Sequence, residues 1–211
     1  PEPSPNAIVP ERPGRVGHQD VVDMAYDRHG NLLSSKTIFR DADGHLTTKN
    51  WTGSYADGPN GKSVLASFAE TTWDPLGNES KIERTGLTYV DGGKNPVSYQ
   101  ETTTDKYGQT SRRTVTGSSF DGDGNLLSFH EESEENGVVQ SKDWSGAVYQ
   151  KYQRDGKDAW RLTSYNETTT DAQGRQSRRE WGGATYDENN SLKSYTQKDT
   201  DPSGESRVLT W

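Results

Sequence analysis

The sequence predicts an all-β protein whose strands, about twelve in number, run antiparallel in a meander of about six hairpin repeats. Three observations favour this fold class. The chain repeats itself with a period of roughly 30 residues. Turn signals recur twice in every unit, and the stretches between them are rich in strand-forming residues, with no apolar pattern at helical spacing.

The repetition is clearest between residues 100–129 and 166–195, which match almost position for position without gaps. Fainter copies fill the remainder of the chain. One glycine recurs in five places, in the motifs WTG, RTG, VTG, WSG and WGG, at Gly53, Gly86, Gly117, Gly146 and Gly183. A repeat of this length indicates a unit that must stack on its neighbours, because one hairpin buries too little apolar surface to be stable alone.

Each unit carries two turn signals. The first is Asp-x-x-Gly after a Thr-rich run, as in Asp105 to Gly108 and Asp171 to Gly174. The second follows a Tyr-Asp or Phe-Asp pair, as in Phe120-Asp121 to Gly124. Asp at the first turn position and Gly at the fourth are typical of a type I turn closed by a left-handed residue. The spacing therefore predicts successive hairpins with short loops.

Between the turns lie runs of about ten residues rich in Thr, Tyr, Trp, Val and Ser, which favour strands. The run 97–104 alternates without producing a strongly apolar face. Gly182 and Gly183 interrupt a strand pattern, which predicts a β-bulge at this repeat position. The sheet is expected to be either extended, including a spiral form, or closed into a barrel, and closure would remove its free edges.

The composition limits the size of the core and the range of functions. The 211 residues are only 27% hydrophobic and contain no Cys, yet they include 6 Trp, 10 Tyr and 4 Phe. Disordered chains are poor in aromatics, so we expect a folded but thin protein. The net charge of −8 argues against nucleic acid or an anionic membrane as the main partner. No apolar run is long enough for a transmembrane helix.

The first segment differs from the rest. Residues 1–17 hold much of the proline and show no period, which predicts a Pro-rich linker or tail. Residues 18–211 are expected to form the β-hairpin repeat domain.

Short motifs within the repeats resemble a known family. Tyr26-Asp27 followed by Gly30-Asn31-Leu32, Phe120-Asp121 followed by Gly124-Asn125-Leu126, and Tyr186-Asp187 look like the YD (Rhs-type) repeats of bacterial surface and toxin-associated proteins. The family's Gly-Arg-Leu core reads Gly-Asn-Leu here, and the unit is longer than the family's usual repeat. The resemblance implies long β-hairpins that wind into a shell or extended sheet, an extracellular location and no catalytic residues.

Several residue sets are candidates for binding, and none indicates an enzyme. Repeated aromatic positions could stack sugar rings or form the thin core. Alternating oxygen ligands in one turn suggest a calcium loop, although turn chemistry explains the same residues and the position that requires Gly is Leu126. Repeated glutamates, Glu70, Glu101 and Glu167, are better explained by cross-strand ion pairs than by catalysis. The candidate ligand-binding residues are Trp51, Trp144, Trp181, Tyr99 and Tyr165, and the candidate calcium ligands are Asp121, Asp123 and Asn125.

Two functional hypotheses follow. The first is a non-enzymatic structural or adhesive module of a bacterial surface or secreted protein, located outside the cell, at its surface or in the periplasm. The second is a β-barrel or curved sheet that binds a glycan or small ligand through its repeated Trp and Tyr positions. Expected partners are a glycan or surface polymer, or a second copy joined through edge strands. No cofactor is expected apart from calcium.

Overall fold

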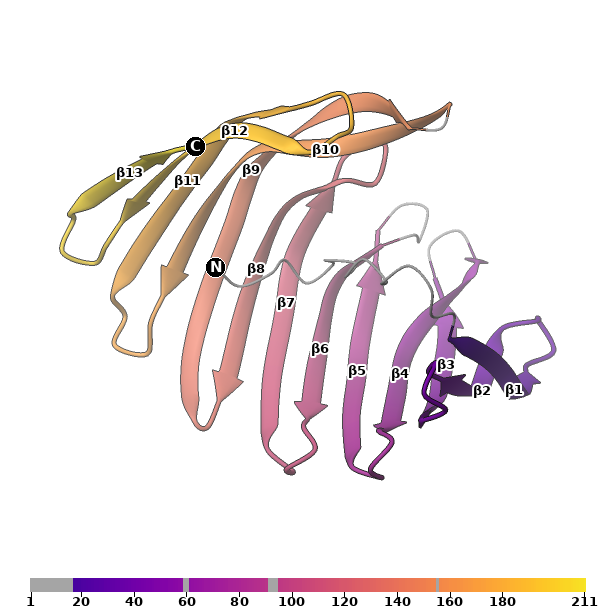
Figure 1. The fold of residues 1–211 in the computed structure, drawn as a ribbon. Helices are drawn as coiled ribbons and strands as arrows, with labels where there is room; N and C mark the ends of the chain where they lie inside the picture. The colour runs from indigo at the N-terminus through magenta and orange to yellow at the C-terminus, as the bar shows by residue number, and fades with distance from the viewer. Residues whose placement is uncertain (1–16, 59–60, 91–94, 155) are drawn as a thin grey trace.

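The computed structural model describes residues 17–58, 61–90, 95–154 and 156–211, which form one antiparallel sheet of thirteen strands (Figure 1). The predicted linker at residues 1–17 lies outside the described part except for Gly17. The strands are β1 (His18–Tyr26), β2 (Leu32–Arg40), β3 (Leu46–Asp57), β4 (Ser63–Trp73), β5 (Glu79–Tyr89), β6 (Pro96–Thr104), β7 (Thr110–Phe120), β8 (Leu126–Glu135), β9 (Val138–Arg154), β10 (Lys157–Thr170), β11 (Gln176–Tyr186), β12 (Leu192–Thr200) and β13 (Ser206–Thr210).

The order of strands in the sheet is the order along the chain, and each strand pairs antiparallel with the next. The sheet is not closed, because β1 and β13 are its two edges. The predicted all-β hairpin meander is therefore confirmed in its extended form, with thirteen strands rather than about twelve. Figure 1 shows a single twisted and curved sheet, with the long β9–β10 hairpin bending over at one side.

An aspartate opens most of the hairpin turns in the described part of the chain. In the β7–β8 turn, the Asp121 backbone N–H donates to the Asn125 carbonyl at 3.0 Å, and the Gly124 N–H donates to the Asp121 carbonyl at 3.1 Å. The same two hydrogen bonds recur in the turns that begin at Asp27, Asp41, Asp74, Asp105, Asp171, Asp187 and Asp201. The residue in the Gly position has a positive φ, as at Gly124 and Asn190, which confirms the predicted turn chemistry.

The predicted bulge is also present. The pairing of β11 with β12 shifts between Gly182 and Thr185, and Gly183 has a φ of 65°. The equivalent residues of β1, β5, β7 and β9 have φ values between 52° and 66°, namely Asp23, Gly86, Gly117 and Gly146. Gly53 of β3 is an exception, because its φ is not left-handed. A Cβ at Gly53 would instead overlap the Trp51 indole.

The hydrophobic core is as thin as the composition suggests. Among the described residues, the buried hydrophobic ones are Val115, Ala147 and Ala184, and Val115 is the least exposed at 5%. Both faces of the sheet therefore contact solvent over most of their area. Stability must come from contacts within the faces, between residues on neighbouring strands.

Candidate functional site

Aromatic rings form a continuous row across the C-terminal half of the sheet, one ring to a strand. The row runs Phe129–Trp144–Tyr165–Trp181–Tyr195–Trp211, from β8 to the residue after β13, with successive ring centroids 5.5 to 5.8 Å apart. A second pair, Trp51 of β3 and Phe68 of β4, stacks at 6.4 Å. We call these residues the aromatic row, and the side of the sheet that carries them the row face.

Strand register places the rings together. Phe129 lies opposite Trp144, and Tyr165 lies opposite Trp181. Tyr195 and Trp211 exchange both backbone hydrogen bonds at 3.0 Å. Directly paired residues share one face of an antiparallel sheet, so the register alone sends these side chains to the same side. The structure therefore brings together three of the predicted ligand-binding residues, Trp144, Tyr165 and Trp181.

The other two predicted aromatic residues lie apart from that run. Trp51 contacts only Phe68 within the aromatic row. Tyr99 of β6 lies between two arginines, with the Arg84 guanidinium 4.3 Å and the Arg113 guanidinium 5.7 Å from its ring centroid. Arg84 also lies 5.3 Å from the Phe68 ring. Arginine–aromatic contacts thus extend the Trp51–Phe68 pair as far as Tyr99 and Arg113.

Beside the aromatic row, the row face carries ion pairs in which acids of even-numbered strands meet bases of odd-numbered strands. Glu101 of β6 contacts Arg84 and accepts a hydrogen bond from Arg113 at 2.7 Å. Lys49 and Glu70 are 2.9 Å apart, and Lys142 and Glu167 are 3.7 Å apart. The three repeated glutamates therefore form cross-strand ion pairs, as the sequence indicated.

One nitrogen atom of this charged set lacks a hydrogen-bond acceptor. The Nε atom of Arg113 is buried and has no hydrogen-bond partner. Its repeat equivalent, Arg179 of β11, donates from Nε to Asp199 at 2.9 Å. Asp199 lies opposite Arg179 in β12, whereas Ser133 lies opposite Arg113 in β8. The shorter serine side chain leaves the Arg113 Nε unpaired.

The geometry of the aromatic row limits what it can bind. Neighbouring rings are inclined by 24° to 39°; Phe129–Trp144 and Tyr165–Trp181 are stacked, and the other contacts of the run are tilted. A sugar ring stacks on an open aromatic face, and each inner ring of the row has an aromatic neighbour on both sides. Trp211 differs, because Tyr195 is the one aromatic ring of the described residues in contact with it, and 60% of the residue is exposed.

The predicted calcium turn has the hydrogen bonding of its neighbours. Asp121 accepts hydrogen bonds from the backbone N–H groups of Asp123 and Asn125 and from the Asn125 side-chain amide, at 2.8 to 2.9 Å. The turns at Asp27 and Asp74 make the same three contacts without a second acid. These bonds hold the pKa of Asp121 below its usual value, chiefly through the Asn125 amide. Calcium binding at Asp121, Asp123 and Asn125 stays a prediction.

Another acidic turn groups three possible ligands. Asp41, Asp43 and His45 of the β2–β3 turn have ligand atoms within 4.8 Å of one another, and this is the one such group found in the described part of the chain. The His45 Nδ1 atom lies 3.0 Å from the Asp41 carboxylate. The same Asp41 carboxylate also accepts the turn's backbone hydrogen bonds. Turn formation accounts for these contacts.

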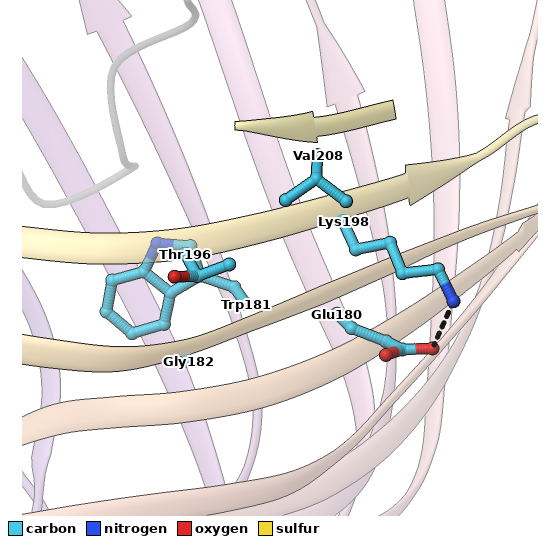
Figure 2. Close-up of a pocket in the computed structure, with 6 residues that line it drawn as sticks. All are labelled: Glu180, Trp181, Gly182, Thr196, Lys198 and Val208. Atoms are coloured by element: carbon cyan, nitrogen blue, oxygen red, sulfur yellow. Dashed lines mark ion pairs between the residues drawn. The ribbon is translucent and has the colours of Figure 1, made fainter. Parts of the chain in front are cut away.

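A shallow depression lies over β11, β12 and β13 (Figure 2). Gly182 and Thr196 lie opposite each other beside it, and Lys198 reaches toward Glu180, with Nζ and Oε1 3.9 Å apart. No enclosed cavity and no catalytic grouping is associated with it. Among the described residues, no helix has the length and apolarity needed to span a membrane.

Sequence reasoning missed half of the aromatic row. Phe68, Phe129 and Tyr195 were not predicted, although a shared motif marks them: an aromatic residue directly after a serine of an even-numbered strand, as in Ser98-Tyr99 and Ser164-Tyr165. Several of these serines bond to a Ser or Thr of the preceding strand, as Ser119 and Ser128 do at 2.6 Å. Trp211 is the repeat equivalent of Trp181, because each lies ten residues after its turn aspartate.

Comparison with known proteins gives no relative: no protein-family model, no curated protein and no solved structure matches this chain. None of these comparisons identifies YD repeats.

Proposed function

We propose that this protein is a non-enzymatic structural module, a β-hairpin repeat that supplies an extended polar sheet to a bacterial surface or secreted protein. The observation that carries the proposal is the open sheet itself. Thirteen strands form one layer with almost no buried core, and repeated rows of side chains hold neighbouring strands together. Because the repeated side chains contact neighbouring strands, they support a structural role in which the protein provides an extended sheet.

The absence of cysteine, the acidic charge and the YD-like motifs motivate the extracellular part of the proposal. We rank glycan binding through the repeated Trp and Tyr positions second. The inner rings of the aromatic row pack against one another, which favours packing over ligand recognition.

Single substitutions in the aromatic row test this ranking. Trp181→Ala removes the ring contacts with Tyr165 and Tyr195 and should cost about 2 kcal/mol, below the 3–5 kcal/mol typical of fully buried Trp. Trp144→Ala should behave similarly. Trp160→Ala is the matched control, because Trp160 contacts Lys151 and lies outside the aromatic row. Chemical denaturation measures the free energy of unfolding.

The same variants report on ligand binding. A panel of oligosaccharides and surface polysaccharides is titrated against the full chain while Trp fluorescence is followed. The structural proposal predicts no saturable quenching. Saturable quenching that Trp144→Ala or Trp181→Ala abolishes, with little loss of stability, would favour the glycan-binding alternative instead.

A further inference from the structure

The β9–β10 hairpin departs from the repeat. Its two strands have 17 and 14 residues, whereas the other strands have 5 to 12, and it bends over at one side of the sheet (Figure 1). We call residues 148–163 of this hairpin the arm. The arm contains four basic and two acidic residues, in a chain whose net charge is −8. It is therefore a basic segment of an acidic protein.

A shallow depression lies at the base of the arm. Its volume is about 670 Å³, compared with about 350 Å³ for the depression over β11, β12 and β13. Residues of the arm and of the end of β11 line it, among them Val148, which is 54% exposed, and Tyr186. The described residues that line it include two bases, Lys151 and Arg161, and no acid.

The two bases differ in their partners. The Lys151 ammonium lies 2.6 Å from the Asp158 carboxylate, so its charge is balanced. Arg161 donates from Nε to the Gln150 amide oxygen at 3.1 Å and from Nη1 to the Asn190 amide oxygen at 3.4 Å. Both acceptors are neutral, and no carboxylate in the described part of the chain pairs with Arg161. The depression therefore holds one cation whose charge is not balanced.

The arginines beside the aromatic row each contact a carboxylate instead. Arg84 and Arg113 contact Glu101, and Arg179 contacts Asp199. Their charges are balanced within the chain, whereas the charge of Arg161 is available to a ligand.

Neutral groups from two elements hold the Arg161 side chain in place. Its guanidinium lies 4.7 Å from the ring centroid of Tyr186 and 5.3 Å from that of Tyr152. The Asn190 amide, which accepts from Arg161, also donates to the Tyr152 hydroxyl at 2.9 Å. Asn190 occupies the left-handed turn position where the other turns that begin with Asp have Gly. The turn that departs from Gly is thus the turn that contacts Arg161.

We propose that this depression binds a carboxylate side chain of an acidic peptide segment from a partner protein, with Arg161 as the anchoring residue. A guanidinium has five N–H donors in a planar fork that matches a carboxylate, and two of the Arg161 donors bond to Gln150 and Asn190. The other donors serve the ligand, and the exposed Val148 offers an apolar contact beside them.

The form and charge of the surface favour a short peptide segment. The depression is shallow, so it suits a chain segment lying across the sheet. The acidic chain outside the arm repels a long polyanion, whereas a segment with a few carboxylates meets mainly the basic arm. The inference concerns the arm alone and does not depend on the proposed structural function.

Peptide binding gives the first test. A fluorescein-labelled peptide of alternating Glu and Ser is titrated with the full chain at low salt while fluorescence anisotropy is followed. Binding should be saturable and should weaken as salt screens the exposed charges. The same peptide with Gln in place of Glu should not bind. Arg161→Gln should raise the dissociation constant at least about tenfold, because it removes a charge-assisted contact.

Arg28→Gln is the matched control. It removes the same charge from the β1–β2 turn, where Arg28 donates to His29, and should leave the dissociation constant unchanged. Circular dichroism confirms that the variants fold. Absence of saturable binding by the Glu peptide, equal binding of the Gln peptide, or equal effects of Arg161→Gln and Arg28→Gln would overturn the proposal.

A second variant tests how Arg161 is positioned. Asn190→Gly restores the residue that the other turns have, so the turn should form, and it removes the amide that contacts Arg161 and Tyr152. The variant should keep its melting temperature but bind the Glu peptide more weakly than the unchanged chain, by less than the loss in Arg161→Gln. Unchanged affinity in Asn190→Gly would contradict the positioning of Arg161 by this turn.

Discussion

Left-handed residues at one repeat position mark five of the odd-numbered strands, β1, β5, β7, β9 and β11. Gly117 has a φ of 62°, and apart from its own atoms and those of its two chain neighbours no heavy atom lies within 4 Å of the place where its Cβ would be. Glycine is therefore favoured at residue 117 by the backbone conformation and not by a lack of space for a side chain. The left-handed conformation costs an L-residue with a side chain about 1–2 kcal/mol. Asp23 occupies the equivalent position of β1, and Asp is among the residues that tolerate it best.

Alanine at two nearby glycines should have opposite effects. Gly117→Ala should lower the free energy of unfolding by about 1–2 kcal/mol because φ is left-handed there. Gly122→Ala should be neutral or stabilising by about 0.4–1 kcal/mol, since Gly122 has no left-handed φ and its Cβ would meet open space. Urea denaturation measures the free energy of unfolding of both variants. Equal losses of unfolding free energy in the two variants would contradict the claim that the left-handed conformation favours glycine at residue 117.

The unpaired Arg113 Nε provides a second test at the residue scale. Ser133→Asn places an amide oxygen opposite Arg113, where Arg179 has the Asp199 carboxylate. The gain should be about 1 kcal/mol, the usual net value of a hydrogen bond. Ser133→Ala supplies no acceptor and should bring no gain. The account of this site fails if Ser133→Asn is no more stable than Ser133→Ala.

The hairpin turns that begin with Asp share the same pair of backbone hydrogen bonds. Asp27, Asp74 and Asp121 each accept a side-chain hydrogen bond from an Asn four residues later, and this bond is the main reason that the pKa of each carboxyl lies below its usual value. A depressed pKa in the folded state means that the ionised carboxylate stabilises the fold. That contribution is complete above the ordinary Asp pKa and is lost as the pH falls through the folded pKa.

Acid should therefore destabilise the protein through its turns. The melting temperature should fall as the pH drops below about 4, the ordinary range of Asp. The double variant Asn78→Ala, Asn125→Ala removes two of the amide donors and should show a shallower fall. Asn189→Ala is the control, because the Asn189 hydrogen bond to Asp187 comes from its backbone N–H. Parallel pH profiles for the three proteins would contradict this role of the turns.

Turns and bulges could be predicted because single residue types determine them. Asp121 and Gly124 specify a turn by local hydrogen bonding and a positive φ, and Gly183 specifies a bulge in the same way. The aromatic row depends on register between strands. Phe129 and Trp144 meet only because β8 and β9 pair as they do, so a search for repeated Trp and Tyr positions found Trp144 and missed its partner Phe129.

At the scale of the whole molecule, the sheet has two faces in solvent and no second layer over its described part (Figure 1). Sequence could not decide between an extended sheet and a barrel, because both use the same hairpins and differ only in whether the last strand pairs with the first. In the structure β13 pairs only with β12, which leaves the sheet open. Thirteen strands at about 4.8 Å spacing span roughly 60 Å.

Small-angle X-ray scattering of the full chain, extrapolated to infinite dilution so that monomers are observed, tests the open single-layer sheet most directly. A compact globule of this length has a radius of gyration of about 17 Å. The account predicts a radius clearly above that value and a maximum dimension of at least about 60 Å, the span of the strand array. A radius near 17 Å with a globular distance distribution would contradict the open sheet and the structural function built on it.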